Sequence, residues 1–225
     1  MYFAACVRIA SRLPFLRIMR TEPIPDLDWL DEPSRADKRI LFARHGQYEG
    51  NLQDICNCDP RRPYGLTALG MQQALGLAEA LRDEGIEMIV SSEFQRARQT
   101  AALIAGVLKV PVAVNSLANE NQVGTALESC KTRLFQESIR ADPANCANPG
   151  GESFVAMKAR LRRLIAQLLM SSPPTILVVT HGWPMQSVRV LQGKINDIDG
   201  ALCMDMPGNC AVVEGRFSWA DLNAE

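Results

Sequence analysis

Short runs of consecutive apolar residues alternate along this chain with longer stretches in which apolar residues recur at helical spacing. The short runs have the length and the bounding turn residues of buried β-strands, and they lie at residues 39–44, 86–92, 110–115, 175–182 and 209–215. The longer stretches predict helices at residues 66–85, 93–109, 150–170 and 183–192. This alternation favours an α/β fold with a mainly parallel sheet and helices on both faces, in which residues 39–44 form a central strand.

The helix expected at residues 66–85 has clear boundary signals. Thr67 is placed to cap its N-terminus, and Gly85 is placed to end it. The apolar residues at helical spacing predict a buried stripe. This stripe is expected to contain Leu69, Met71, Ala74, Leu75, Ala78 and Leu81.

Residues 116–149 have weaker periodicity than the rest of the chain. We expect them to leave the sheet as an excursion that contains a helix at residues 126–140, and such excursions often close over sites. The helix at residues 150–170 has a basic face that is expected to be solvated surface. That face comprises Lys158, Arg160, Arg162 and Arg163.

The overall charge and the cysteines narrow the class of protein. The chain has 24 basic and 25 acidic residues among 225, so its net charge gives no reason to expect a nucleic acid or an anionic membrane as partner. Seven cysteines are scattered without the spacing of metal ligands. An odd, irregular set of cysteines is typical of a reduced, intracellular protein, and we expect a cytoplasmic location.

The first 37 residues differ from the rest and are expected to form an N-terminal extension and tether. Residues 1–20 are basic and amphipathic, which would suit contact with a membrane or a transit-like signal, but we favour a segment that docks on the domain or a start at Met19. Residues 21–37 hold three prolines and six acidic residues, as expected of a tether. Residues 38–225 then form one catalytic domain; the sequence makes no prediction of oligomeric state.

Both histidines of the chain follow expected strands. His45 comes after the first strand together with Arg44, and His181 follows the strand at residues 175–182. Arg96 comes after another strand, and each histidine is followed by glycine, which lets a backbone N–H approach a ligand closely. Because ligands bind outside the carboxyl ends of parallel strands, we expect these side chains to meet at one edge of the sheet.

Two imidazoles, two arginines and a carboxylate are sufficient for phosphoryl transfer. Guanidinium groups present forked donors that match phosphate oxygens. A neutral imidazole among them is able to attack phosphorus and form a covalent phosphohistidine. A carboxylic acid then protonates the leaving oxygen and later takes a proton from water. We therefore expect no cofactor and no metal.

Five segments resemble, in this order, the motif series of the histidine phosphatase superfamily, the phosphoglycerate-mutase-like proteins. They read LFARHGQYEGN, LTALGMQQA, SSEFQRARQTA, GGESF and VVTHG, and they fall within residues 38–215. The resemblance implies a three-layer α/β/α sandwich, a nucleophilic His45, and a phosphoryl group held by Arg44, Arg96 and His181. It also implies that Asn51 lines the pocket, and Gly46 leaves room for the phosphate.

The family resemblance further points to a general acid in the segment LANENQVG, where Glu120 lies four residues before a glycine. Asn121 and Gln122 depart from the family pattern, so Glu128 is the alternative acid and Glu49 a third. Glu152, in GGESF, is expected to support the site or the start of its helix.

The function expected is hydrolysis of a small-molecule phosphomonoester. The alternatives are a phosphotransferase of the phosphoglycerate mutase type and a non-catalytic module that binds a phosphorylated ligand. The interval before GGESF is shorter than in the mutases, which favours hydrolysis. Tyr48 and Trp183 are placed to line the pocket and favour an apolar or flat substrate, whereas Arg61 and Arg62 are expected to be solvated.

Overall fold

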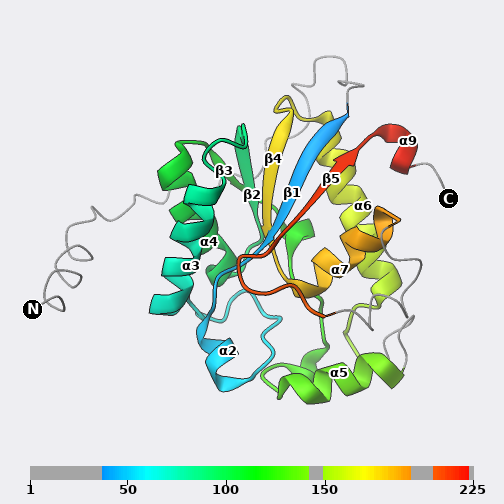
Figure 1. Cartoon of the computed structure of the whole chain (residues 1–225). Helices are drawn as coiled ribbons and strands as arrows, with labels where there is room; N and C mark the ends of the chain where they lie inside the picture. The colour runs from blue at the N-terminus through cyan, green and yellow to red at the C-terminus, as the bar shows by residue number, and fades with distance from the viewer. Residues whose placement is uncertain (1–36, 142–148, 194–204, 223–225) are drawn as a thin grey trace, which may run out of the picture.

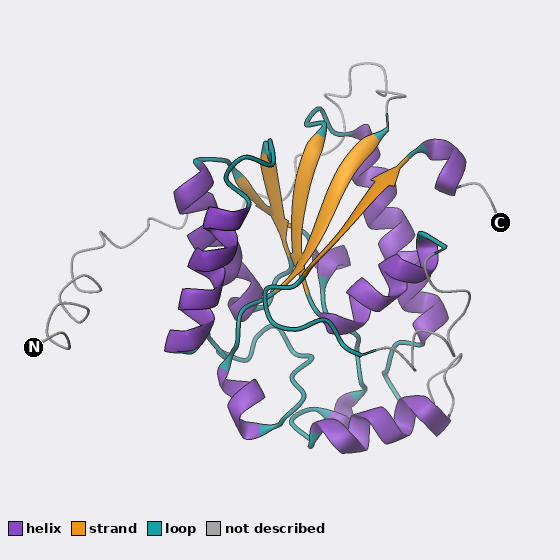
Figure 2. Cartoon of the chain, viewed as in Figure 1, coloured by secondary structure: helices purple, strands orange, loops and turns teal. Residues whose placement is uncertain are grey.

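The computed structural model describes residues 37–141, 149–193 and 205–222. A twisted five-stranded sheet runs through the middle of this part of the chain, between two layers of helices (Figures 1 and 2). The expected three-layer α/β/α architecture is therefore confirmed. The predictions for residues 1–36 lie outside the described residues, and the division into an extension and one catalytic domain stays a prediction.

The strands have the order β3-β2-β4-β1-β5. They are β1 (Lys38–Arg44), β2 (Met88–Ser91), β3 (Val112–Val114), β4 (Thr175–Thr180) and β5 (Val212–Phe217). The first four are parallel, and only β5 is antiparallel to its neighbour β1. Strand β1 pairs on both sides, which confirms its interior position. Arg44 lies opposite Thr180 in the β1–β4 pair, so His45 and His181 leave adjacent strands at the same level.

The helices are distributed over both faces and the carboxyl edge of the sheet. Helices α3 (Ala68–Ala80) and α4 (Gln95–Leu108) cover one face, and α6 (Phe154–Met170) and α7 (Gly182–Leu191) cover the other (Figure 1). Helices α2 (Glu49–Gln53) and α5 (Thr132–Ala141) lie beyond the carboxyl ends of the parallel strands (Figure 1). A short α9 (Trp219–Leu222) follows β5. No helix of the described part is long and apolar enough to span a membrane.

Alternate residues of the buried strands supply two separate cores. In β1, Ile40 and Phe42 pack toward α6 and α7, whereas Leu41 and Ala43 pack toward α3 and α4. Both faces of β4 are buried in the same way, which is why these strands read as uninterrupted apolar runs. The edge strand β3 is instead partly exposed.

The excursion between β3 and α6 differs from its prediction in one respect. A 3-10 turn, η2 (Thr125–Leu127), and helix α5 replace the single helix expected at residues 126–140. Ser129, between them, has a left-handed backbone with φ of 62°, which an α-helix does not accommodate. Residues 142–148, later in this excursion, lie outside the described part.

The buried stripe of α3 is shifted from the one that we expected. Thr67 caps the helix as predicted, with its hydroxyl oxygen accepting from the Gly70 amide at 3.0 Å. Leu69, Met71 and Leu75 are half-exposed, so their prediction as core residues is wrong. The buried positions are Gly70, Ala74, Leu77, Ala78 and Leu81. The first buried positions of this face hold small residues, because the helix there lies close to a neighbouring backbone.

Gly70 makes that close approach possible. A Cβ atom added at Gly70 would lie 1.9 Å from the backbone oxygen of Gln47, and one added at Gly46 would lie 2.5 Å from the Gly70 oxygen. The loop that follows His45 therefore packs backbone against backbone on the first turn of α3. Only glycine fits at both positions, because the contacting atoms belong to the main chain and have no rotamer to change.

We expect Gly70→Ala to lower the free energy of unfolding by about 2–4 kcal/mol, because overpacking against backbone forces a main-chain shift. The matched control is Gly76→Ala in the same helix, where an added Cβ meets nothing within 4 Å. That change should raise stability by about 0.5–1 kcal/mol through helix propensity. Urea denaturation of both variants measures the difference, and equal stability of the two would contradict the packing argument.

Candidate active site

His45 begins the site at the end of β1, where its ring is almost fully buried. Its Nδ1 lies 2.8 Å from the Gly46 carbonyl oxygen, and its Nε2 lies 3.2 Å from Nε of Arg96. A carbonyl only accepts and a guanidinium only donates, so the hydrogen is on Nδ1 and the lone pair on Nε2. The structure thus leaves Nε2 as the basic nitrogen of a neutral ring.

Arg96, in the first turn of α4, is the largest fully buried side chain of the described residues. Its Nη1 and Nη2 donate to the side-chain and main-chain oxygens of Asn57, at 2.7 and 3.1 Å. The rings of Tyr48 and Phe94 each lie 4.4 Å from its guanidinium carbon. These contacts fix the direction of its remaining donor, Nε, toward His45.

Arg44 is the last residue of β1 and directly precedes His45. Its Nη1 donates to the Pro207 carbonyl at 2.6 Å. Its Nε is buried and has no hydrogen-bond partner within the described residues. An unpaired buried donor on a cation is costly unless a ligand satisfies it, so this atom favours an anion in the cavity.

His181 caps α7 after β4, and its ring is fully buried. Its Nε2 lies 2.7 Å from the Ser92 hydroxyl, and its ring centroid is 5.0 Å from that of His45. Nδ1 of this ring has no partner in the described part of the chain. The expectation that both histidines meet at one edge of the sheet is therefore met by the geometry.

Burial and the positive charges around the two rings keep both of them neutral. Burial lowers the pKa of His45 well below its ordinary value, and the charges of Arg96 and Arg44 lower it further. Burial and the same two guanidinium groups also hold the pKa of His181 well below that value. At neutral pH each ring therefore carries no charge, and His45 keeps its lone pair for a reaction.

Glu120 is the carboxylate that lines the same cavity as His45. Burial raises its pKa, partly offset by the Asn121 amide and the Arg96 charge. One carboxyl oxygen, Oε1, accepts the Asn121 amide at 2.9 Å. A proton on this acid therefore belongs on Oε2, the oxygen that does not accept from Asn121.

The two alternative carboxylates lie elsewhere. Glu128 accepts hydrogen bonds from Nδ2 of Asn57 at 2.9 Å and from the Cys58 amide at 2.7 Å. It therefore steadies the loop that holds Arg96. Glu49 is exposed on α2 and does not line the cavity. Of these three carboxylates, only Glu120 lines the cavity that His45 also lines.

Asn51 and Asn209 close the loop that follows His45. Asn51 lines the cavity, as expected, and its side-chain oxygen accepts from the Tyr48 amide at 3.2 Å. Asn209 donates to the His45 carbonyl at 3.0 Å and to the same Asn51 oxygen at 3.4 Å. Sequence analysis missed Asn209, Asn57 and Ser92, because no periodicity or spacing marks a residue that binds the site across 39 or more positions.

The cavity has a volume of about 110 Å³ and is lined by apolar as well as charged side chains. Tyr48 and Trp183 both line it, as expected, and Trp183 packs edge-to-face on Phe135 at 5.9 Å. The Tyr48 hydroxyl donates to the Ile55 carbonyl at 3.1 Å, and burial raises its pKa to about 12. Arg61 is exposed and paired with Asp59 at 2.9 Å, in agreement with a solvated loop charge.

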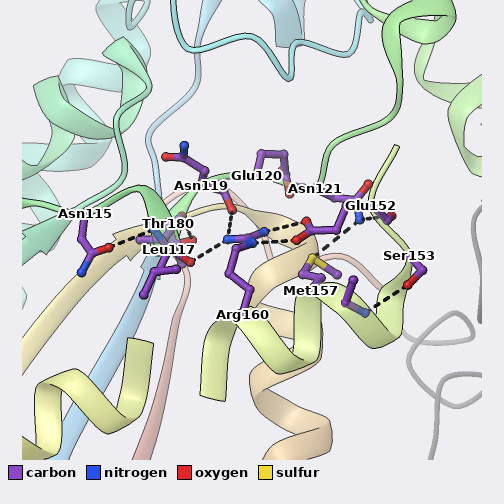
Figure 3. Close-up of polar contacts among 12 residues, drawn as sticks. Asn115, Leu117, Asn119, Glu120, Asn121, Glu152, Ser153, Met157, Arg160 and Thr180 are labelled. Carbon is purple, nitrogen blue, oxygen red and sulfur yellow. Dashed lines mark hydrogen bonds and ion pairs between the residues drawn. The ribbon is translucent and has the colours of Figure 1, made fainter. Parts of the chain in front are cut away.

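Arg160 contradicts the prediction of a wholly solvated basic face on α6. Its side chain is 13% exposed and forms a forked ion pair with Glu152, at 2.7 and 2.8 Å. It also donates to the carbonyl oxygens of Leu117 and Asn119, at 2.6 and 3.0 Å (Figure 3). The exposure of Arg160 was predicted wrongly because its partners belong to loops outside the helix, which the helical pattern does not reveal. Arg163 on the same helix is exposed, as expected.

We expect His45 to remain neutral, with hydrogen on Nδ1, at pH 6 in phosphate-free buffer, where an ordinary histidine is mostly protonated. The lowered pKa places its protonation at lower pH. Because the chain has only two histidines, ¹⁵N-detected correlation spectra contain two ring systems, and His45→Asn assigns them. A ring charged at pH 6, or hydrogen on Nε2 alone, would contradict this geometry.

The chain is similar in sequence or in fold to known phosphatases. The chain is 30% identical over 150 residues to the adenosylcobalamin/alpha-ribazole phosphatase of Escherichia coli strain K12, covering 64% of this chain and 73% of that protein. It is 32% identical over 159 residues to a bifunctional protein of Mycobacterium tuberculosis, of which it spans 42%. The native structure of a mycobacterial glucosyl-3-phosphoglycerate phosphatase has the same fold, with a TM-score of 0.70, 24% identity and coverage of 83% of this chain and 93% of that chain. The model of the histidine phosphatase superfamily (branch 1) matches residues 40–217, and the chain belongs to this family.

Proposed function

We propose that this chain is a phosphomonoesterase that hydrolyses a small phosphorylated metabolite through a phosphohistidine on His45, without a metal ion. The observation that carries the proposal is the unprotonated Nε2 of His45, which faces Arg96 in a cavity also lined by Glu120. Family membership and the names of the relatives support phosphatase chemistry in general.

The first half-reaction transfers the phosphoryl group to the enzyme. The lone pair of Nε2 attacks phosphorus, the bond to the ester oxygen breaks, and that oxygen takes the proton from Glu120. As Nε2 forms its bond, the ring becomes positive, and its Nδ1–H bond to the Gly46 carbonyl becomes a stronger, charge-assisted one. The guanidinium groups of Arg44 and Arg96 stabilise the negative oxygens of the group in flight.

The second half-reaction restores the enzyme. Water attacks the phosphohistidine while the Glu120 carboxylate takes its proton, the P–N bond breaks, and inorganic phosphate leaves. Burial supports the acid role of Glu120, because it raises the pKa of the carboxyl, while the Asn121 amide and the Arg96 charge favour the carboxylate that acts as the base. His181, neutral and oriented by Ser92, supplies a ring nitrogen beside the nucleophile for the phosphoryl oxygens.

The lining of the cavity favours hydrolysis over mutase chemistry. Of the described residues around the cavity, only Arg44 and Arg96 are cationic, and both serve the reacting phosphoryl group. A mutase must also hold a displaced intermediate that carries a second phosphate. The wall formed by Trp183, Phe135 and Tyr48 instead suits a leaving group with an apolar face.

We expect His45→Ala to abolish both the turnover of p-nitrophenyl phosphate and the formation of an acid-labile, alkali-stable phosphoryl label on the protein. His181→Ala should lower turnover by about 10²-fold or more but still accept the label, since it removes only stabilisation of the transition state. Rapid quench with a ³²P-labelled phosphomonoester measures both. Full activity of His45→Ala, or activity lost to a chelator, would contradict the mechanism.

We expect Glu120→Gln to lower kcat by about 10²–10³-fold for an alkyl phosphate, whose leaving oxygen needs a proton, and much less for p-nitrophenyl phosphate. Because the acid works only when protonated, wild-type kcat should fall as pH rises through the raised pKa of Glu120, and the variant should lose this limb. Glu128→Gln is the control and should keep the wild-type preference between the two substrates. If Glu128→Gln changes the substrate preference and Glu120→Gln does not, the general acid is Glu128.

A further inference from the structure

Glu120 lies in a stretch whose position no regular element fixes. The 3-10 turn η1 (Ser116–Ala118) ends two residues before it, and η2 begins at Thr125. Besides local bonds within the η1 turn, several hydrogen bonds of residues 117–122 come from other elements of the fold. Thr180 at the end of β4 donates to the Ala118 carbonyl at 2.7 Å, two residues before Glu120.

Arg160 holds the stretch immediately before Glu120. One nitrogen, Nη1, donates to both Leu117 and Asn119, whose carbonyl oxygens have no partner in the turn itself (Figure 3). The other two nitrogens are paired with the Glu152 carboxylate. Because both ends of the guanidinium group are bonded, the group is held in one orientation. It therefore also holds the peptide group that joins Asn119 to Glu120.

Glu152 holds the stretch immediately after Glu120. Its main-chain oxygen accepts from Nδ2 of Asn121 at 3.1 Å, and its amide donates to the Gln122 carbonyl at 2.6 Å. Its side chain is paired with Arg160. The two partners of this ion pair therefore hold the chain on both sides of Glu120. The two side chains are 13% and 14% exposed, so water competes little for these bonds.

We propose that Arg160, paired with Glu152, is a positioning residue for Glu120 and places its carboxyl group for proton transfer to the leaving oxygen. The inference rests on the proposed function, in which Glu120 is the general acid. Proton transfer needs the two oxygens within hydrogen-bond distance, and a displacement of about 1 Å can cost about 10²-fold in rate. An acid on an irregular loop depends on such support more than one on a helix or strand.

The test compares Arg160→Met with Arg163→Met, which removes the same charge from an exposed position of the same helix. For Arg160→Met we expect kcat for an alkyl phosphate to fall by about 30-fold or more, and kcat for p-nitrophenyl phosphate to fall less than about 3-fold. Arg163→Met should leave both values unchanged. Equal losses for the two substrates in Arg160→Met would show a merely structural role and overturn the proposal.

A double-mutant cycle with Glu120→Gln makes the test specific. Once the acid is absent, adding Arg160→Met should change the ratio of the two kcat values less than about 2-fold, since nothing remains to be positioned. A further large change would show that Arg160 acts independently of Glu120 and would overturn the proposal. If Glu120→Gln alone leaves the substrate ratio unchanged, the acid assignment of the proposed function fails first.

Arg160→Met also leaves the Glu152 carboxylate unpaired, which is destabilising in a partly buried site. The double variant Glu152→Met/Arg160→Met removes both charges and keeps the test valid if the single variant unfolds. Thermal unfolding followed by circular dichroism checks that each variant is folded at the assay temperature. A folded double variant with the substrate ratio of the wild type would overturn the proposal.

Discussion

The site depends on one buried cation. Arg96 is enclosed by two aromatic rings and by the oxygens of Asn57, and it directs a single N–H at Nε2 of His45. That hydrogen bond prevents Nε2 from carrying its own hydrogen, and the Gly46 carbonyl accepts the hydrogen on Nδ1. Without a guanidinium held in this way, no donor would favour the tautomer of the buried imidazole that has its lone pair on Nε2. The surrounding loops serve this arrangement: the Cys58 loop is held by Glu128, and the Gly46 amide is held by Thr100.

Much of this arrangement was readable from local sequence. The buried strands and the cap at Thr67 depend on residues within a few positions of one another, and the parallel sheet then places Arg44, His45, Arg96 and His181 at one edge. What failed depends on distant backbone. The stripe of α3 was misplaced because Gly70 contacts Gln47 across 23 positions, and a periodic pattern carries no information about that contact. Arg160 was misread for the same reason, since its partners lie up to 43 positions away.

The two groups that carry the proposed chemistry are set in contrasting ways. His45 is fixed by a strand, by a glycine pair and by direct bonds to its ring, so its orientation follows from the core. The Glu120 carboxyl accepts the Asn121 amide, and the main chain around it is held by Arg160, Glu152 and Thr180 through neighbouring residues. Burial lowers the pKa of His45 and raises that of Glu120, and in both cases it disfavours the charged form. Such opposite shifts suit a base and an acid that act in one cavity.

The antiparallel direction of β5 has a consequence for when the site exists. Because β5 runs opposite to its neighbour, its N-terminal side, with Asn209, arrives at the edge where the parallel strands end. The Asn209 amide then ties the His45 carbonyl to Asn51, across 164 positions of the chain. During synthesis the ribosome must therefore release residues beyond 209 before this loop is closed. A nascent chain with its first four strands already paired would still lack the bonds that join the His45 carbonyl to Asn51.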